Sequence, residues 1–394
     1  MTAIDDTTWS VPRTEVMRAA RRFLAEGRRG VLATIVAVEG SAYRRPGAKM
    51  LIPEGGEGIG HITAGCLEDE VQEIAAEVLA AGEPRLETYD LMQDDEDVWG
   101  LGVGCNGVID ILLEPLDDSY APAIEAYDAG GRVGVLTVLG GDGADALGVP
   151  QGTRAYYHPD AAAGDAEPDT VSGDADFPDE VADALRDAAS RLAERGQADT
   201  LTVETDAGEV RVFVDGVRAP PSLVVCGSGH DVGPMVELGS RNDFRVTVVG
   251  FRGAVDLEER FPEAAHTVTT SPGRLREDLS FDDNTYAVVA THNFVDDRLA
   301  VDELLRTDVP YVGVMGPRDR FEEMLAEFRG EDRSFAPGEL DRVYTPIGLN
   351  LGGGEPYQIA TSIVSEVLAV HNDRDPGHLR DREGPIHERV EPTQ

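Results

Sequence analysis

The sequence predicts a two-domain α/β protein whose C-terminal half is a doubly wound parallel sheet. Two observations lead to this prediction. From Ser222 onward, short apolar runs alternate with helical patterns, which is typical of a parallel sheet covered by helices on both faces. The first of these runs leads directly into a glycine turn. The 394 residues are enough for two domains, each with its own core.

The first predicted domain is an N-terminal α/β domain over residues 14–118, preceded by an extension of residues 1–13. Apolar residues at helical spacing predict a helix over 14–27, and a second helix begins just after Cys66. Acidic residues in the first turn of that helix, among them Glu68, favour its start. The predicted strands are residues 30–40, 49–53, 86–91 and 106–116.

A middle segment, residues 119–217, separates the two domains. It begins with a strand at 131–140 and continues into a Gly-, Asp- and Ala-rich stretch over 140–180, which predicts a long surface excursion. A helix over 178–195 follows, and then a hairpin over 200–216.

The second predicted domain, residues 218–370, begins at Arg-Ala-Pro-Pro, where the two prolines stiffen the chain. Its predicted strands are residues 222–226, 245–250, 266–270, 286–291 and 311–316. The polar segment 371–394 is expected to be a disordered tail.

The charge balance excludes one class of partner. Acidic residues number 75 against 34 basic ones, for a net charge of -41, and Lys49 is the only lysine. Such a surface repels phosphate backbones, so nucleic-acid binding is not expected. Acid-rich, lysine-poor composition is typical of proteins from salt-accumulating halophiles, where concentrated salt screens the self-repulsion. The acidic N-terminus does not resemble a signal peptide, and no apolar run approaches the roughly 20 residues that span a bilayer. We therefore expect a cytoplasmic protein without membrane contact.

Three cysteines are too few and too scattered for a disulfide framework, and none forms a Cys-x-x-Cys pair. Cys66 and Cys105 lie next to glycines, Gly65 and Gly104, which permit close approach to a ligand. Cys226 lies inside an apolar strand, which predicts a packing role.

The glycine turn predicts an anion site. Gly227 permits a tight turn after the strand, Gly229 lets a phosphate approach the backbone, and a helix is expected to begin near His230. The second strand ends in Gly250-Phe-Arg252, without the carboxylate that holds the ribose of NAD. Arg252 could pair instead with a phosphate, as in NADP. The alternative is that His230 merely starts the helix.

Several segments together resemble one family. They are ATIVAVEGSAYRRPGAKMLI (33–52), GHITAGCLEDEV (60–71), GLGVGCNGVIDILLEPL (100–116), PPSLVVCGSGHDVG, ERFPEA (259–264), THNFVDD (291–297), YVGVMGPRDR (311–320) and PIGLNLGGGEPYQIATSIVSEVLA (346–369). In this order they are similar to the XdhC/CoxI family of accessory proteins of molybdenum hydroxylases such as xanthine dehydrogenase and carbon monoxide dehydrogenase. The chain departs from the family pattern at Ser228, at Gly250-Phe251, at Pro317 and at Tyr357-Gln358.

The resemblance implies a Rossmann-like C-terminal domain and a maturation role. Such proteins bind molybdenum cofactor, assist its sulfuration by a cysteine desulfurase, and deliver it to the apo-hydroxylase. The resemblance therefore favours a carrier over a turnover enzyme. A homodimer is one arrangement that would cover a reactive cofactor. The alternative is an NADP-dependent oxidoreductase that uses the C-terminal turn, and a third hypothesis is a redox-sensing thiol protein.

Molybdenum cofactor needs a soft ligand for the metal and donors for its phosphate and pterin. Cys66 and Cys105 are candidate molybdenum contacts, because thiolate is the soft choice. In the loop Glu39–Gly47, the Ser41 hydroxyl and the guanidinium groups of Arg44 and Arg45 are candidate cofactor donors. Packing of the cysteines and ion pairs of the arginines with nearby acids are the structural alternatives.

Three further candidates complete the predicted site. Glu68, in the first turn after Cys66, is a candidate cofactor contact. Gly352, in a run of three glycines, permits close backbone approach to a phosphate or simply forms a loop. His292 follows a strand at the carboxyl edge of the parallel sheet, where it is a candidate for proton transfer.

Overall fold

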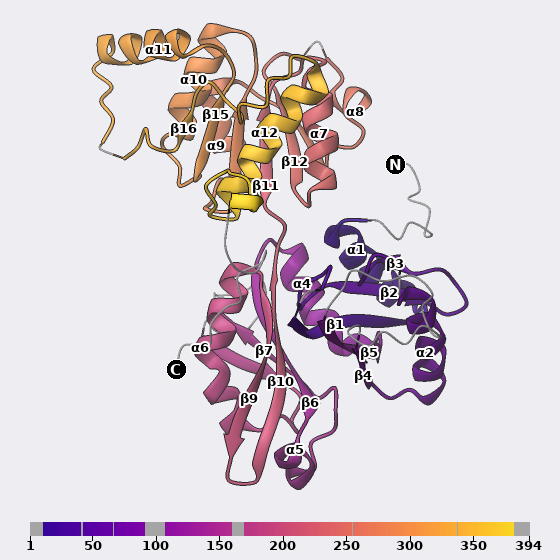
Figure 1. The fold of residues 1–394 in the computed structure, drawn as a ribbon. Helices are drawn as coiled ribbons and strands as arrows, with labels where there is room; N and C mark the ends of the chain where they lie inside the picture. The colour runs from indigo at the N-terminus through magenta and orange to yellow at the C-terminus, as the bar shows by residue number, and fades with distance from the viewer. Residues whose placement is uncertain are drawn as a thin grey trace. The chain divides into compact units, whose positions relative to one another are not determined.

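A computed structural model describes residues 11–40, 42–65, 67–90, 107–159, 169–253, 255–336 and 338–381. The chain divides into two compact units, which meet in the sequence at Ala219 and Pro220, inside the Arg-Ala-Pro-Pro segment. Figure 1 shows the helices and strands of both units.

The N-terminal unit contains two antiparallel sheets of five strands each. The first has the order β3-β2-β1-β5-β4 and joins β1 (Gly30–Gly40), β2 (Lys49–Pro53), β3 (Ile59–Gly60), β4 (Arg85–Asp90) and β5 (Gly107–Pro115). Helix α2 (Glu68–Ala81) packs on one face through Val71, Ala75 and Val78, and α1 (Arg13–Glu26) packs on the other through Phe23. The apolar strands and amphipathic helices predicted for this half are therefore present.

The second sheet has the order β8-β7-β6-β10-β9. Its strands are β6 (Arg132–Gly140), β7 (Arg154–His158), β8 (Thr170–Gly173), β9 (Ala198–Thr205) and β10 (Gly208–Arg218). Its helical elements are η1 (Asp118–Tyr120), α4 (Ala121–Asp128), α5 (Asp142–Leu147) and α6 (Asp179–Arg195). Helix α6 covers one face of the sheet, whereas α4 packs beside α1 on the other.

The hairpin predicted over 200–216 is confirmed, since β9 and β10 pair in antiparallel register from Thr205 and Gly208. The surface excursion predicted over 140–180 is wrong for the described residues of that stretch, and residues 160–168 lie outside them. Helix α5 and strands β7 and β8 lie there, and β7 pairs with β6. The glycines and acids of this stretch obscured a five-residue strand, Arg-Ala-Tyr-Tyr-His, whose residues are all buried.

Two buried ion pairs connect the sheets of the N-terminal unit. Lys49 on β2 lies 2.8 Å from Asp215 on β10, and both side chains are 3% exposed. Burial lowers the pKa of Lys49, and the charge of Asp215 opposes that change. Arg154 on β7 donates to both carboxylate oxygens of Glu114 on β5. The only lysine of the chain is thus a core residue that joins two sheets.

The C-terminal unit is one six-stranded sheet of order β13-β12-β11-β14-β15-β16, in which all neighbours are parallel. The strands are β11 (Ser222–Cys226), β12 (Arg245–Gly250), β13 (His266–Thr269), β14 (Thr285–Val289), β15 (Tyr311–Val314) and β16 (Val343–Tyr344). The helices are α7 (Val232–Arg241), α8 (Leu257–Arg260), α9 (Leu275–Asp278), α10 (Phe294–Leu304), α11 (Arg318–Gly330) and α12 (Pro356–His371), with the short turns η2 (Pro272–Arg274) and η3 (Leu379–Asp381).

Helices cover both faces of this sheet, because alternate residues of each strand point to opposite sides. On β11, Leu223 and Val225 pack with α7, α8 and α12, whereas Val224 and Cys226 pack with α9, α10 and α11. Figure 1 shows α7 and α12 side by side over the sheet. The predicted doubly wound parallel sheet is confirmed.

Cys226 is fully buried, and burial raises the pKa of its thiol to about 12. The prediction that it packs in the core is confirmed. Within the described ranges, none of the helices combines the length and the apolarity that a membrane span requires.

Candidate functional site

The carboxyl ends of β11 and β14 form the candidate site of the C-terminal unit. The chain leaves β11 toward β12 on one side, while β14 pairs with β11 on the other. Ligands of open α/β sheets bind where the strand order reverses in this way, outside the carboxyl ends of the strands. The glycine turn follows β11, and the segment beginning at Thr291 follows β14, so the fold brings both predicted segments to this edge.

Packing within the protein explains the first glycine of the turn. A Cβ on Gly227 would lie 2.5 Å from the carbonyl oxygen of Ala290, at the end of β14. A Cβ on Gly229 would lie 2.3 Å from Oδ1 of Asp231. Helix α7 begins at Val232, two residues later than predicted, so His230 precedes it as an exposed residue. Close approach to a phosphate remains a prediction. Close contact with backbone atoms accounts for Gly227, whereas Gly229 meets only the end of a side chain.

His292 and Asp231 form a hydrogen-bonded pair at the edge of the sheet where the strand order reverses. Nε2 of His292 lies 2.8 Å from Oδ2 of Asp231, and the histidine side chain is 59% exposed. An ionised carboxylate only accepts, so this contact assigns the proton to Nε2 and leaves Nδ1 for another partner. His292 has φ of 57°, a left-handed conformation uncommon for a non-glycine residue. The pair is therefore built to orient an exposed imidazole.

A buried carboxylate fixes the segment that carries His292. Oδ1 of Asp297 accepts from the backbone N–H and the hydroxyl of Thr291, and Oδ2 accepts from Arg320 on α11. Asp297 is 1% exposed. Asn293 caps α10 by accepting from the N–H groups of residues 295 and 296, both at 3.0 Å. These hydrogen bonds therefore fix the turn that carries the His292 side chain.

Two arginines border the glycine turn. Arg252, predicted to bind a phosphate, lies 3.2 Å from Asp296 at the start of α10. A phosphate would have to compete with that carboxylate for the exposed guanidinium. Nη1 of Arg260 donates to the carbonyl oxygen of Ser228 at 2.7 Å and so restrains the turn itself.

Side chains of α12 hold the loop that contains Gly352. Glu366 accepts from the Tyr311 hydroxyl at 2.7 Å and from the N–H of Gly348 at 2.8 Å. Burial raises the pKa of Tyr311 well above its usual range, and the nearby charge of Glu366 adds to this effect. Gly352 has φ of 75° and open space where a Cβ would point, so its conformation alone favours glycine.

Two of the N-terminal candidates, Arg44 and Glu68, contact residues between His61 and Leu67. Nη1 of Arg44 lies 3.3 Å from Nε2 of His61, and Arg45 is exposed. Glu68 is buried and accepts from the backbone N–H of Thr63 at 2.8 Å and of Leu67 at 3.1 Å. Its carboxylate therefore organises the residues on both sides of position 66.

Three predicted site residues, Ser41, Cys66 and Cys105, lie outside the described residues, so their contacts stay predictions. Across the ranges that the structure describes, no group of three or more histidine, cysteine or acidic side chains could hold a metal ion.

The sequence analysis missed Asp231 and Arg260. Asp231 follows His230 directly, but acids are so frequent in this chain that one more carried no signal. Arg260 lies in the segment ERFPEA, which pointed to the family and not to a role.

The parallel sheet and the site at its reversal of strand order define a Rossmann-type protein with a second α/β unit. Comparison with protein families refines this class. Residues 223–367 match the XdhC Rossmann domain, and residues 23–90 match the XdhC and CoxI family. The chain belongs to the XdhC and CoxI family.

One curated relative and one solved structure resemble most of the chain, and a second relative resembles less than half of it. It is 28% identical over 352 residues to a probable xanthine dehydrogenase subunit of Bacillus subtilis, covering 88% of this chain and 94% of that protein. It is 27% identical over 173 residues to the uncharacterized protein YqeB of Escherichia coli, covering 44% of this chain and 31% of that protein. The fold matches the crystal structure of a xanthine dehydrogenase from Bacillus halodurans with a TM-score of 0.71 at 24% identity, over 93% of this chain and 97% of that one.

Proposed function

We propose that the protein binds molybdenum cofactor as cargo, holds it while a cysteine desulfurase supplies the terminal sulfur, and delivers it to a molybdenum hydroxylase of the xanthine dehydrogenase type. The observation that carries the proposal is family membership in both units, together with a relative named as a probable subunit of xanthine dehydrogenase. The desulfurase supplies the sulfur, so the carrier needs no redox step of its own.

The N-terminal unit offers groups whose chemistry suits the cargo. Thiolates of Cys66 and Cys105 would be soft ligands for molybdenum. Arg44 contacts His61, which begins the segment leading to Cys66, and its guanidinium suits the anionic phosphate of the cargo. Glu68 fixes Thr63 and Leu67, so it would position residue 66 and not contact the cargo itself.

The test is retention of the cofactor in molar potassium chloride under argon. The purified protein is mixed with molybdenum cofactor and gel-filtered, and molybdenum and pterin are assayed in the protein peak. We expect retention by the unaltered chain and its loss in Cys66→Ala or Cys105→Ala. Cys226→Ala, which alters a buried packing cysteine, is the matched control and should retain the cofactor.

A second variant tests the proposed phosphate contact. Arg44→Gln should weaken retention, whereas Arg21→Gln, on the exposed side of α1, should not. Absence of retention by the folded, unaltered protein would overturn the carrier function.

The Asp231–His292 pair favours a second candidate, an NADP-dependent oxidoreductase in which His292 donates a proton. The Asp231 carboxylate beside the turn and the engagement of Arg252 by Asp296 both oppose a bound phosphate. A ligand that binds only the folded state raises the melting temperature. An unchanged melting temperature with NADPH in large excess would therefore reject this candidate.

A further inference from the structure

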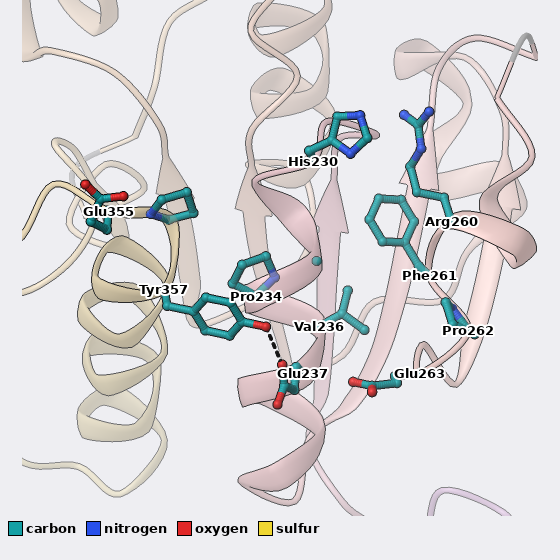
Figure 2. Close-up of a pocket in the computed structure, with 12 residues that line it drawn as sticks. His230, Pro234, Val236, Glu237, Arg260, Phe261, Pro262, Glu263, Glu355 and Tyr357 are labelled. Carbon is teal, nitrogen blue, oxygen red and sulfur yellow. Dashed lines mark hydrogen bonds between the residues drawn. The ribbon is translucent and has the colours of Figure 1, made fainter. Parts of the chain in front are cut away.

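A pocket of about 530 Å³ lies on one helical face of the C-terminal unit. Its floor is α7, one wall is the segment that follows α8, and the other wall is the start of α12 (Figure 2). This volume is in the range of sites that enclose a ligand of several groups. The pocket therefore has room for a side chain of another protein together with its neighbouring backbone.

An exposed tyrosine ring borders the pocket. Tyr357 is 55% exposed, and its hydroxyl donates to Glu237 on α7 at 2.6 Å, so the ring is held in place while much of it stays accessible. Position 357 is also one at which the chain departs from the family pattern, so this ring is a feature of this chain. Tyrosine and arginine are among the residues that most often carry the binding energy of protein–protein contacts. A fixed, exposed tyrosine in a pocket thus favours contact with another protein.

The acidic end of the pocket has one carboxylate available to an incoming group. Glu355 is the N-cap of α12 and accepts from the backbone of its first turn. Glu237 accepts from Tyr357 and lies 3.3 Å from Arg241, so partners inside the protein engage both of its oxygens. Glu263 is exposed and is the carboxylate that an incoming group would meet.

The opposite end of the pocket is cationic. Figure 2 shows His230 and Arg260 together at this end and the carboxylates of Glu237 and Glu263 at the other. Arg260 uses one of its five N–H donors on Ser228, so others remain for an anionic group. A segment that carries both charges would therefore enter in one direction only, with its cation at the acidic end.

A guanidinium group matches the acidic end better than an ammonium group does. It is planar, so it stacks on the face of an aromatic ring, and it donates two parallel N–H bonds to one carboxylate. The Glu237 carboxylate that accepts the hydrogen bond of Tyr357 raises the pKa of this tyrosine, and the negative charge of Glu263 raises it further. Glu263 therefore lies close enough to Tyr357 for one guanidinium to meet both.

We propose that this pocket is a docking site for an extended segment of a partner protein that carries an arginine and, two residues away, an acidic residue. The guanidinium stacks on Tyr357 and pairs with Glu263, and the acidic side chain lies at Arg260 and His230. Alternate side chains of an extended segment point to the same side, so both enter the pocket. The proposal deepens the carrier function and rests on it only in requiring that a protein partner docks.

NMR titration of the cofactor-free full chain with blocked peptides, in potassium chloride, tests the proposal. The first peptide is acetyl-Ala-Arg-Ala-Glu-Ala-amide. In three others, citrulline or lysine replaces the arginine, or glutamine replaces the glutamate. Citrulline keeps the shape of arginine and removes its charge. We expect the first peptide to bind at least about fivefold more tightly than each of the others. No cofactor is present, so a negative result here leaves the carrier function standing, and loss of cofactor retention leaves this result standing.

Three variants with matched controls locate the two contacts. Glu263→Gln and Tyr357→Leu should each weaken binding of the first peptide about fivefold or more. Glu258→Gln and Tyr43→Leu, at exposed positions that do not line the pocket, should not change it. In Arg260→Gln, the peptides with glutamate and with glutamine should bind equally.

Several results would overturn the proposal. One is equal binding of the first peptide and any of the other three by the unaltered chain. Another is binding that neither Glu263→Gln nor Tyr357→Leu weakens, or no binding of any peptide up to about 10 mM. Free L-arginine that binds as tightly as the first peptide would assign the pocket to a small molecule. A dimer of the chain that Glu263→Gln dissociates would assign it to a second copy.

Discussion

The pair Lys49–Asp215 allows a quantitative prediction about the stability of the N-terminal unit. The perturbation is Asp215→Asn, which keeps the shape of the side chain and removes its charge. Two cations lose an ionic contact, since Lys49 lies 2.8 Å and Arg13 3.5 Å from the carboxylate. Removing one member of a buried ion pair costs about 3–5 kcal/mol, because the remaining charge stays buried without compensation.

The magnitude for this pair should lie in the upper half of that range. Both side chains are 3% exposed, so solvent screens them little. The ammonium group keeps a hydrogen bond to the neutral hydroxyl of Thr34 at 3.3 Å, which replaces little of the charge interaction with Asp215. Adding Lys49→Met removes the buried charge, so the double variant should recover about 2 kcal/mol or more relative to the sum of the single changes.

The assay is urea unfolding followed by circular dichroism, fitted with a separate transition for each unit. Only the transition of the N-terminal unit should move. Burial lowers the folded pKa of Lys49 below its unfolded value of about 10.4, and loss of the Asp215 charge, which opposes this change, lowers it further. The deficit of Asp215→Asn in unfolding free energy should therefore become smaller as pH rises toward about 10.4, because its folded state releases the Lys49 proton at lower pH than the folded wild type does. Additive losses in the double variant would refute the reasoning, since they would mean that the two charges do not interact.

Three further predictions concern single residues. Burial lowers the pKa of His158, so the wild type should lose stability as pH falls below about 6.5. In urea unfolding between about pH 7 and 5, the unfolding free energy of His158→Gln should fall less steeply than that of the wild type, and equal slopes would contradict this. Cys226, with a pKa raised to about 12, should react with iodoacetamide at about pH 8 only after unfolding, as mass spectrometry would show; labelling of the native protein would contradict its burial. Gly227→Ala should lower the unfolding free energy by about 1–3 kcal/mol in calorimetry, because the new Cβ would meet Ala290. Gly233→Ala, at a position on α7 that faces open space, should not lower it, and equal effects would exclude the contact as the cause.

The elements that sequence predicted well are those with a local signal. The apolar run Ser222–Cys226 predicts a buried strand with no knowledge of its neighbours, and the turn at Asp206–Gly208 predicts its hairpin in the same way. The strand Arg154–His158 was missed because its five residues lie between stretches rich in glycine and acids. Pairing with β6, and not its own propensity, makes it a strand.

The sequence by itself determined the family, the parallel sheet of the C-terminal half, the core position of Cys226 and the place of the glycine turn. Periodicity and glycine placement act within one element, so they can be read along the chain. Tertiary structure decided that Asp231 holds His292, that Lys49 is buried against Asp215, and that Arg260 and Tyr357 border one pocket. These relations join residues far apart in the sequence, and their energies depend on distances and burial that only the packing of separate elements sets.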